Sequence, residues 1–215
     1  MRIKICGITK EDQGSAIAKM GATDLGFICY PPSPRYISIE KIQNIINLLP
    51  DTIGKIGVFV NENLENIEKI ITQTSITGVQ LHGEESPQYC QEIRKIFPQI
   101  EIIKAFRIKN KDSFIQIKKY YNQVNTLLFD AYDPKLSGGT GKTLNWELLL
   151  EFKPPLPWFL AGGLSPDNIK IALSKLSVDG IDLSSGVEIS PGNKDLKKVT
   201  TLFEIISNFQ NQINK

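Results

Sequence analysis

The chain has 215 residues, of which 41% are hydrophobic and 22% are charged, and this suits one globular domain with a large core. Lys and Arg number 25 and Asp and Glu number 23, so the net charge of +2 argues against a dedicated nucleic-acid or membrane-surface protein. No apolar run approaches the ~18 residues that a membrane-spanning helix needs. Small-molecule chemistry in a soluble domain is the remaining expectation.

The cysteine and histidine content limits the chemistry further. The three cysteines are odd in number and widely spaced, which suits a reducing compartment better than a disulfide framework. The N-terminal residues have no signal-peptide core, so we expect a cytoplasmic protein. The single histidine, His82, excludes a histidine-cluster metal site and any Ser-His-Asp triad without it. We therefore expect no metal bound by a histidine cluster.

Short runs rich in β-branched and aromatic residues recur about every 25 residues, roughly the size of one strand–helix unit. Most are apolar on both alternations, which is typical of parallel strands that are covered on both faces. The runs predict eight strands, at residues 2–6, 24–30, 55–60, 78–81, 101–106, 126–130, 158–162 and 178–183.

Amphipathic stretches separate and follow the expected strands. They predict eight helices, at residues 10–21, 38–49, 61–73, 86–97, 112–121, 145–152, 165–176 and 195–213. Ser38 is placed to cap the second helix. Ser-Pro opens both 86–97 and 165–176, which supplies a cap and a first-turn proline.

Eight strands alternating with eight helices, without a break in composition, predict one (β/α)8 TIM barrel over residues 1–215. A doubly wound open sheet is the main competitor. The count of eight and the lack of a Gly-rich loop after the first strand favour the barrel. An enzyme of this fold carries its site at the C-terminal ends of the strands.

Two of these strand ends carry residues suited to proton transfer. Cys6 ends the first strand, as a small buried hydrophobe or as a general base whose thiol needs a slightly lowered pKa. Asp130 ends the sixth strand after an apolar run. It is interpreted either as a turn residue or as an acid with a raised pKa. Cys29 within a strand and Cys90 within a helix are interpreted as structural.

The seventh and eighth strands are followed by glycine-containing loops. Gly162 and Gly163 follow one strand, and Ser184, Ser185 and Gly186 follow the next. Backbone N–H groups and helix N-termini in such adjacent loops form the usual phosphate site of a barrel. Tight turns are the alternative reading, but the pairing on neighbouring strands favours phosphate.

The longest irregular stretch covers residues 130–143 and contains Gly-Gly-Thr-Gly-Lys-Thr. It does not form a P-loop, because Leu136 stands where the first glycine is needed and the strand ends well before Gly138. We expect its glycines to serve a lid that closes over substrate.

Two further polar residues lie in loops at the same end of the barrel. His82 closes the fourth strand, where it hydrogen-bonds a loop or takes part in the site. Arg35 lies in the loop after the second strand. It is interpreted either as a solvated charge or as a bidentate clamp on a substrate carboxylate.

Longer motifs at these positions are together highly specific. KICGIT (4–9), GFICYPPSPRYIS (26–38), VQLHGEE (79–85), GGTGKTLNW (138–146), LAGGLSPDN (160–168) and DLSSGVEISPGNKD (182–195) are the longest of them. From residue 4 to about 195 the chain resembles the phosphoribosylanthranilate isomerase family of tryptophan biosynthesis. The resemblance implies an Amadori rearrangement of N-(5-phosphoribosyl)anthranilate without a cofactor.

The resemblance also implies roles for single residues. Asp130 matches the general acid and Cys6 the general base, while Arg35 matches the residue that holds the anthranilate carboxylate. Asp182 has the same strand parity as Ser184 and is similar to a family residue near the sugar. His82 matches a family position without an assigned role. The residues of the two glycine-containing loops, 162–163 and 184–186, match the phosphate-binding loops of the family.

Other classes of function agree less well with the chain. Indole-3-glycerol-phosphate synthase, a related barrel enzyme, has an N-terminal extension and catalytic lysines at strand ends, which this sequence lacks. A non-catalytic sugar-phosphate-binding barrel would not need Cys6 and Asp130 together. No repeat or exposed apolar stripe supports a scaffold. The expected partner is a small-molecule substrate, and the protein is expected to be a monomer or homodimer.

Overall fold

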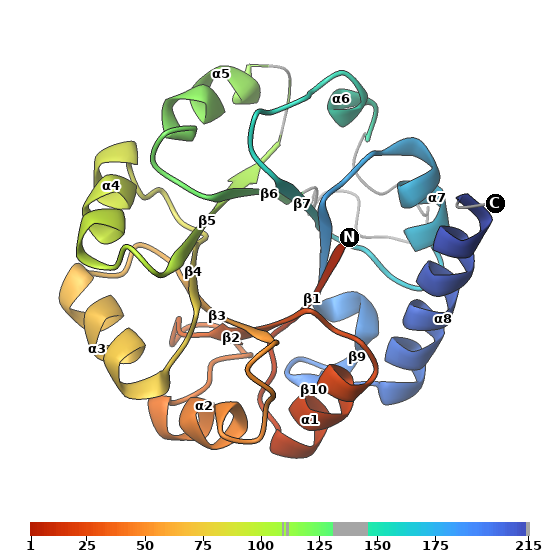
Figure 1. The fold of residues 1–215 in the computed structure, drawn as a ribbon, viewed down its shortest axis with the longest axis horizontal. Helices are drawn as coiled ribbons and strands as arrows, with labels where there is room; N and C mark the ends of the chain where they lie inside the picture. Colours follow the sequence, from red (N-terminus) through yellow and green to blue (C-terminus); the bar gives the residue numbers. More distant parts are fainter. Residues whose placement is uncertain (109, 111, 131–145, 214–215) are drawn as a thin grey trace.

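The structure, a computed structural model, describes residues 1–108, 110, 112–130 and 146–213. Its eight main strands pair in parallel and in chain order, and β1 also pairs with β8, so the sheet closes into a barrel (Figure 1). These strands are β1 (Arg2–Cys6), β2 (Asp24–Ile28), β3 (Gly54–Phe59), β4 (Gly78–Leu81), β5 (Glu101–Arg107), β6 (Thr126–Asp130), β7 (Trp158–Ala161) and β8 (Gly180–Leu183). The predicted (β/α)8 barrel is confirmed, and closure between β1 and β8 excludes the open sheet.

Helices surround the barrel as an outer ring (Figure 1). They are α1 (Glu11–Lys19), α2 (Ile39–Ile46), α3 (Leu64–Thr74), α4 (Pro87–Ile96), α5 (Ser113–Ile117), α6 (Glu147–Leu150), α7 (Ile169–Lys175) and α8 (Leu196–Ile213). Ser38 and Ser86 each accept a hydrogen bond from a first-turn N–H, as their sequence positions predict. None of the helices in the described ranges is long and apolar enough to cross a membrane.

The structure departs from the expected elements in two places near β8. Helix α7 begins at Ile169 rather than at residue 165, because the Asn168 side chain bonds Ser165 N and Gly163 O and holds the preceding residues in a turn. A hairpin of two short strands, β9 (Glu188–Ser190) and β10 (Asn193–Lys194), precedes α8. The sequence analysis did not predict this hairpin.

Apolar side chains pack in two layers. The main core lies between the strands and the helices, and it includes fully buried residues such as Ile5, Phe27 and Phe129. A smaller cluster is Ile56, Ile103, Ala105, Leu128, Phe159 and Ala161. Alternate residues of a strand point to opposite faces, so one set of side chains meets the helices and the other fills the barrel.

Strand β1 contributes polar side chains at alternate positions. Arg2 donates to the carboxylates of Asp24 on β2 and Glu101 on β5, at 3.1 and 2.9 Å. Two residues further on, the buried Lys4 ammonium pairs with Asp182 on β8. Cys6 completes the series at the C-terminal end of the strand. This alternation places the thiol at the mouth of the barrel, above a buried ion pair.

Candidate active site

A pocket of about 470 Å³ lies at the C-terminal ends of the strands. Nine of the ten residues singled out in the sequence line it, and they are Cys6, Arg35, His82, Asp130, Gly162, Gly163, Asp182, Ser184 and Ser185. The tenth, Gly186, lies outside the lining, in the 3-10 turn that follows Ser184. The candidate base and the candidate acid therefore face one cavity although they come from β1 and β6.

Cys6 is a buried thiol surrounded by charge. Burial raises the pKa of Cys6 above its ordinary value, while the ammonium groups of Lys4 and Lys194 oppose that rise. The slight lowering that a base would need is therefore not present, but two cations already act in that direction. Cys29 and Cys90 are also buried, and burial raises the pKa of each to about 12.

Lys4 and Asp182 form the floor beneath the thiol. Their ion pair is 2.9 Å long and joins β1 to β8, at a point where the two residues are also register partners. Burial lowers the pKa of Lys4, but Asp182 and Cys6 outweigh it and leave the pKa raised. Lys4 is thus a charged ammonium close to the Cys6 side chain.

Arg35 reaches the pocket from the loop after β2 and is held by Glu188. Its Nε lies 3.0 Å from Oε1 of Glu188, and its Nη2 lies 2.7 Å from Oε2. The side chain passes close over Gly7, where a Cβ would lie 2.8 Å from Arg35 Cδ. Only glycine at position 7 leaves space for this path, and its φ of +77° also favours glycine.

Asp130 ends β6 beside the histidine of β4. Oδ2 of Asp130 lies 3.3 Å from Nε2 of His82, and Gln80 donates from Nε2 to Nδ1 of the same ring at 2.9 Å. Since Nδ1 accepts a hydrogen bond, the ring proton of a neutral His82 lies on Nε2 and faces the carboxylate. Asp130 and His82 are both about one-fifth exposed, at 21% and 23% of their side chains.

The loops after β7 and β8 lie against one another. Gly162 and Gly163 have φ of +89° and +65°, and a Cβ on Gly163 would meet open space. Gly186 has no such space, because a Cβ there would collide with the carbonyl oxygen of Leu164. Glycine at 186 therefore allows the loops after β7 and β8 to approach each other closely.

A second pocket of about 680 Å³ lies beside the first and shares His82 with it. Its other lining residues include Arg107, Lys119 and Tyr120. The predicted lid, residues 130–143, lies outside the described residues except for Asp130. No group of three His, Cys, Asp or Glu side chains in the described ranges is arranged to hold a metal ion.

Three charged residues of the site were missed in the sequence. Lys4 has the same strand parity as Cys6, so the alternation rule applied to Asp182 and Ser184 would have found it. Glu188 and Lys194 lie within the 182–195 motif, but no role was predicted for either of them. Their burial depends on the hairpin, for which the sequence has only a Pro-Gly signal.

Comparison with known proteins agrees with this geometry. The model of the family "N-(5'phosphoribosyl)anthranilate (PRA) isomerase" matches residues 3–205. This chain belongs to the phosphoribosylanthranilate isomerase family. The N-(5'-phosphoribosyl)anthranilate isomerase of Rippkaea orientalis is 58% identical over 99% of both chains, and that of Microcystis aeruginosa is 59% identical over 99% of this chain and 100% of its own.

Solved structures of the family have the same fold. The phosphoribosyl anthranilate isomerase of Thermotoga maritima has a TM-score of 0.87 and 36% identity over 97% of this chain and 99% of its own. A phosphoribosyl anthranilate isomerase in complex with reduced 1-(o-carboxyphenylamino)-1-deoxyribulose 5-phosphate has a TM-score of 0.85 and 33% identity, with the same coverage.

Proposed function

We propose that this protein isomerises N-(5-phosphoribosyl)anthranilate to 1-(2-carboxyphenylamino)-1-deoxyribulose 5-phosphate, a step of tryptophan biosynthesis. The observation that carries this proposal is the single pocket, in a chain of this family, that holds a thiol, a carboxyl group, a guanidinium and two glycine loops. Each of these groups corresponds to one part of the substrate: the sugar carbon, the ring oxygen, the anthranilate carboxylate and the phosphate.

Asp130 is proposed as the general acid. It protonates the ribose ring oxygen, the bond from that oxygen to the anomeric carbon breaks, and the nitrogen lone pair forms an iminium. The transfer leaves Asp130 as a carboxylate. His82 donates toward that carboxylate from Nε2 at 3.3 Å, so it stabilises the product of the proton transfer and orients the acid.

Cys6 is proposed as the general base. Its thiolate removes the proton from the sugar carbon next to the iminium, and the electron pair of that C–H bond neutralises the nitrogen to form an enolamine. Tautomerisation of the enolamine gives the ketone. The iminium is the electron sink, so the reaction redistributes atoms within one molecule and needs no oxidant or organic cofactor.

The remaining pocket residues are proposed to bind and orient substrate. Arg35 holds the anthranilate carboxylate, and Asp182 lies near the sugar, fixed there by Lys4. Backbone N–H groups of the loops at Gly162–Gly163 and at residues 184–186 hold the phosphate. Asn168 keeps the first of these loops in one conformation, with 2.9 Å bonds to Gly163 O and Ser165 N.

The cellular location and the partners of the protein are part of the same proposal. We expect a cytoplasmic enzyme whose partner is its small-molecule substrate, with no nucleic-acid or membrane partner. The monomer or homodimer expectation stays a prediction. One solved relative is described as generated monomers of the dimeric Thermotoga maritima enzyme. Sedimentation of the purified protein over a range of concentrations measures which state applies here.

A fluorescence assay with freshly prepared phosphoribosylanthranilate tests the function. The anthranilate fluorescence of the substrate is expected to decay faster with enzyme, and the product is expected to have the mass of the substrate. Release of CO₂ with a lower product mass would instead indicate ring closure and decarboxylation. A folded protein that leaves the uncatalysed decay rate unchanged would contradict the proposal.

A further inference from the structure

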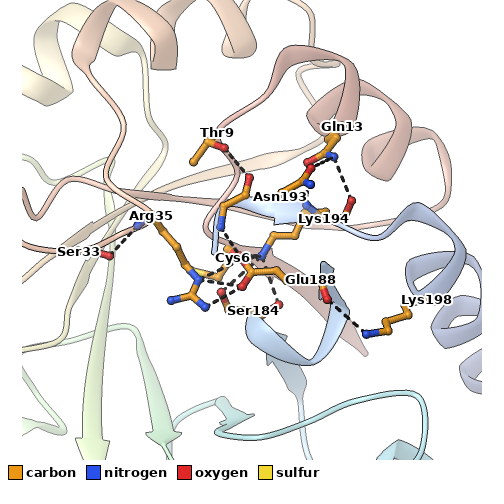
Figure 2. Close-up of polar contacts among 11 residues, drawn as sticks. Cys6, Thr9, Gln13, Ser33, Arg35, Ser184, Glu188, Asn193, Lys194 and Lys198 are labelled. Atoms are coloured by element: carbon orange, nitrogen blue, oxygen red, sulfur yellow. Dashed lines mark hydrogen bonds and ion pairs between the residues drawn. The ribbon is translucent and has the colours of Figure 1, made fainter. Parts of the chain in front are cut away.

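The hairpin of β9 and β10 carries two buried charged residues that the proposed mechanism does not use. Glu188 is 7% exposed and Lys194 only 1%, which is rare for charged side chains unless they are paired. Figure 2 shows both side chains beside Cys6, with Glu188 bound to the Arg35 guanidinium, so the hairpin contacts both the proposed base and the proposed carboxylate clamp.

Lys194 contacts three segments of the chain through one ammonium group. Its Nζ donates to the backbone oxygen of Cys6, lies 3.3 and 3.4 Å from the O and Oγ of Ser184, and lies 2.8 Å from Oε1 of Glu188 (Figure 2). Burial lowers the pKa of Lys194, and Glu188 opposes this. Four acceptors around one nitrogen favour the form with three N–H donors.

Glu188 continues the contact from Lys194 to Arg35. The carboxylate binds the Nε–Nη2 edge of the guanidinium bidentately and also accepts from the backbone N–H of Gly192 at 3.1 Å. These contacts lower the pKa of Glu188 against the effect of burial. Nη1 of Arg35 has no hydrogen-bond partner in the described part of the chain, which leaves it for a substrate carboxylate.

The hairpin is fixed to the start of the barrel. The side chain of Gln13 on α1 accepts from Lys194 N at 2.8 Å and donates to Lys194 O at 3.0 Å. Thr9 donates its hydroxyl to the backbone oxygen of Gly192. Because the backbone on both sides is held by hydrogen bonds, Lys194 keeps a defined position relative to β1.

We propose that Lys194 is a positioning residue that, through Glu188, aligns the Cys6 thiol with the Arg35 guanidinium. The inference rests on the proposed function, because it takes Cys6 as the base and Arg35 as the clamp. One unbroken series of contacts joins the two groups, from Cys6 to Lys194, Glu188 and Arg35.

The charges of this series also favour a thiolate at Cys6. Lys194, Glu188 and Arg35 carry two positive charges and one negative charge, so they leave one positive charge beside the thiol. Replacing Lys194 by a neutral residue removes that excess, and the Cys6 thiol then needs a higher pH to ionise.

Other groups also face the thiol. Lys4 on β1 pairs with Asp182 on β8 at 2.9 Å, and its ammonium group, like that of Lys194, opposes the rise in the pKa of Cys6. Cys29, which follows β2, interacts with Cys6, but its pKa of about 12 keeps it a neutral thiol near pH 7. Because Lys4 and Asp182 stay in place when Lys194 is replaced, a Lys194 variant isolates the contribution of the hairpin.

Alkylation of Cys6 tests the proposal without relying on turnover. The rate of iodoacetamide reaction at Cys6, followed by peptide mass spectrometry, is measured from pH 6 to 10 in wild type and in Lys194→Met. We expect the midpoint of the Lys194→Met profile to rise by about one pH unit, which slows the reaction ~10-fold near pH 7. An unchanged midpoint would overturn the proposal.

Lys194→Gln is measured alongside, because its amide keeps a donor toward the Cys6 carbonyl and preserves the fold if methionine does not. We expect the same upward shift, since the charge is removed in both variants. Lys198→Met is the matched control, because the Lys198 ammonium donates to the backbone oxygen of Glu188 at 3.3 Å and not to its carboxylate. Its profile is expected to match wild type, and an equal shift in this control would overturn the assignment to Lys194.

The clamp is tested by binding. We measure Kd for the product analogue, reduced 1-(o-carboxyphenylamino)-1-deoxyribulose 5-phosphate, and for its counterpart without the carboxylate. Lys194→Met is expected to reduce the preference for the carboxylated compound at least ~3-fold, and an unchanged preference would overturn the link to Arg35. A shifted thiol midpoint with unchanged turnover would support the positioning role and contradict the proposed base instead.

Discussion

The two sides of the pocket are built differently. On the base side, Cys6 is buried among ion pairs from β1, β8 and the hairpin, and those pairs are themselves almost fully enclosed. On the acid side, Asp130 and His82 are each about one-fifth exposed and face each other across 3.3 Å. The thiol is therefore surrounded by fixed buried charges, while the carboxyl group faces the imidazole of His82.

This difference agrees with the roles proposed for the two groups. A thiol that is to lose its proton in a buried site needs positive charge close by, because burial favours the neutral form. A hydrogen-bond donor such as His82 stabilises the carboxylate that the proposed acid becomes after the proton transfer. The predictions below test whether the two sides contribute as the geometry suggests.

Removing the base is expected to have the largest effect. Cys6→Ser should lower kcat at least ~10²-fold, because a hydroxyl group ionises far less readily than a thiol near pH 7. The fluorescence assay measures the loss, and a thermal melt checks that the fold remains. Cys90→Ser, buried in α4 outside the pocket lining, is the control and should keep wild-type kcat.

Removing the acid is expected to have a comparable effect. Asp130→Asn should lower kcat at least ~10²-fold, since an amide accepts and donates hydrogen bonds but does not release a proton to the ring oxygen. Binding of the reduced product analogue should change less than ~3-fold, because the clamp and the phosphate loops are untouched. Turnover close to wild type would remove Asp130 from its assigned role.

Changing the clamp should act on binding rather than on chemistry. Arg35→Met is expected to raise KM ~10-fold or more with kcat within ~3-fold, because it removes a charge-assisted hydrogen bond worth about 1.5–3 kcal/mol. Steady-state kinetics separate the two constants. An unchanged KM would show that the carboxylate is held elsewhere.

The smallest effect is expected at the neighbour of the acid. His82→Gln should lower kcat less than ~10-fold, because the 3.3 Å contact with Asp130 is long and glutamine retains a donor. The loss of kcat in His82→Gln is compared with the loss in Lys194→Met. We expect the larger loss for the buried lysine. A loss as large as that of Asp130→Asn would instead make His82 part of the proton transfer.

Much of the architecture follows from local patterns in the chain. Short runs of β-branched and aromatic residues place all eight strands close to their observed bounds, and caps such as Ser38 depend only on residues three positions away. The start of α7 was predicted too early, because the Asn168 side chain holds residues 165–168 in a turn. The hairpin escaped prediction because its strands have only three and two residues.

The strand-end rule of a barrel places Cys6, Asp130 and the glycine loops at one mouth, so the sequence by itself determined which groups meet there. Tertiary structure decided their surroundings. Lys194 lies 188 residues from Cys6, and Glu188 lies 153 residues from Arg35. Backbone periodicity reveals which face a side chain takes. Which charged residue a side chain meets across the barrel depends on packing and burial, and these are properties of the folded chain alone.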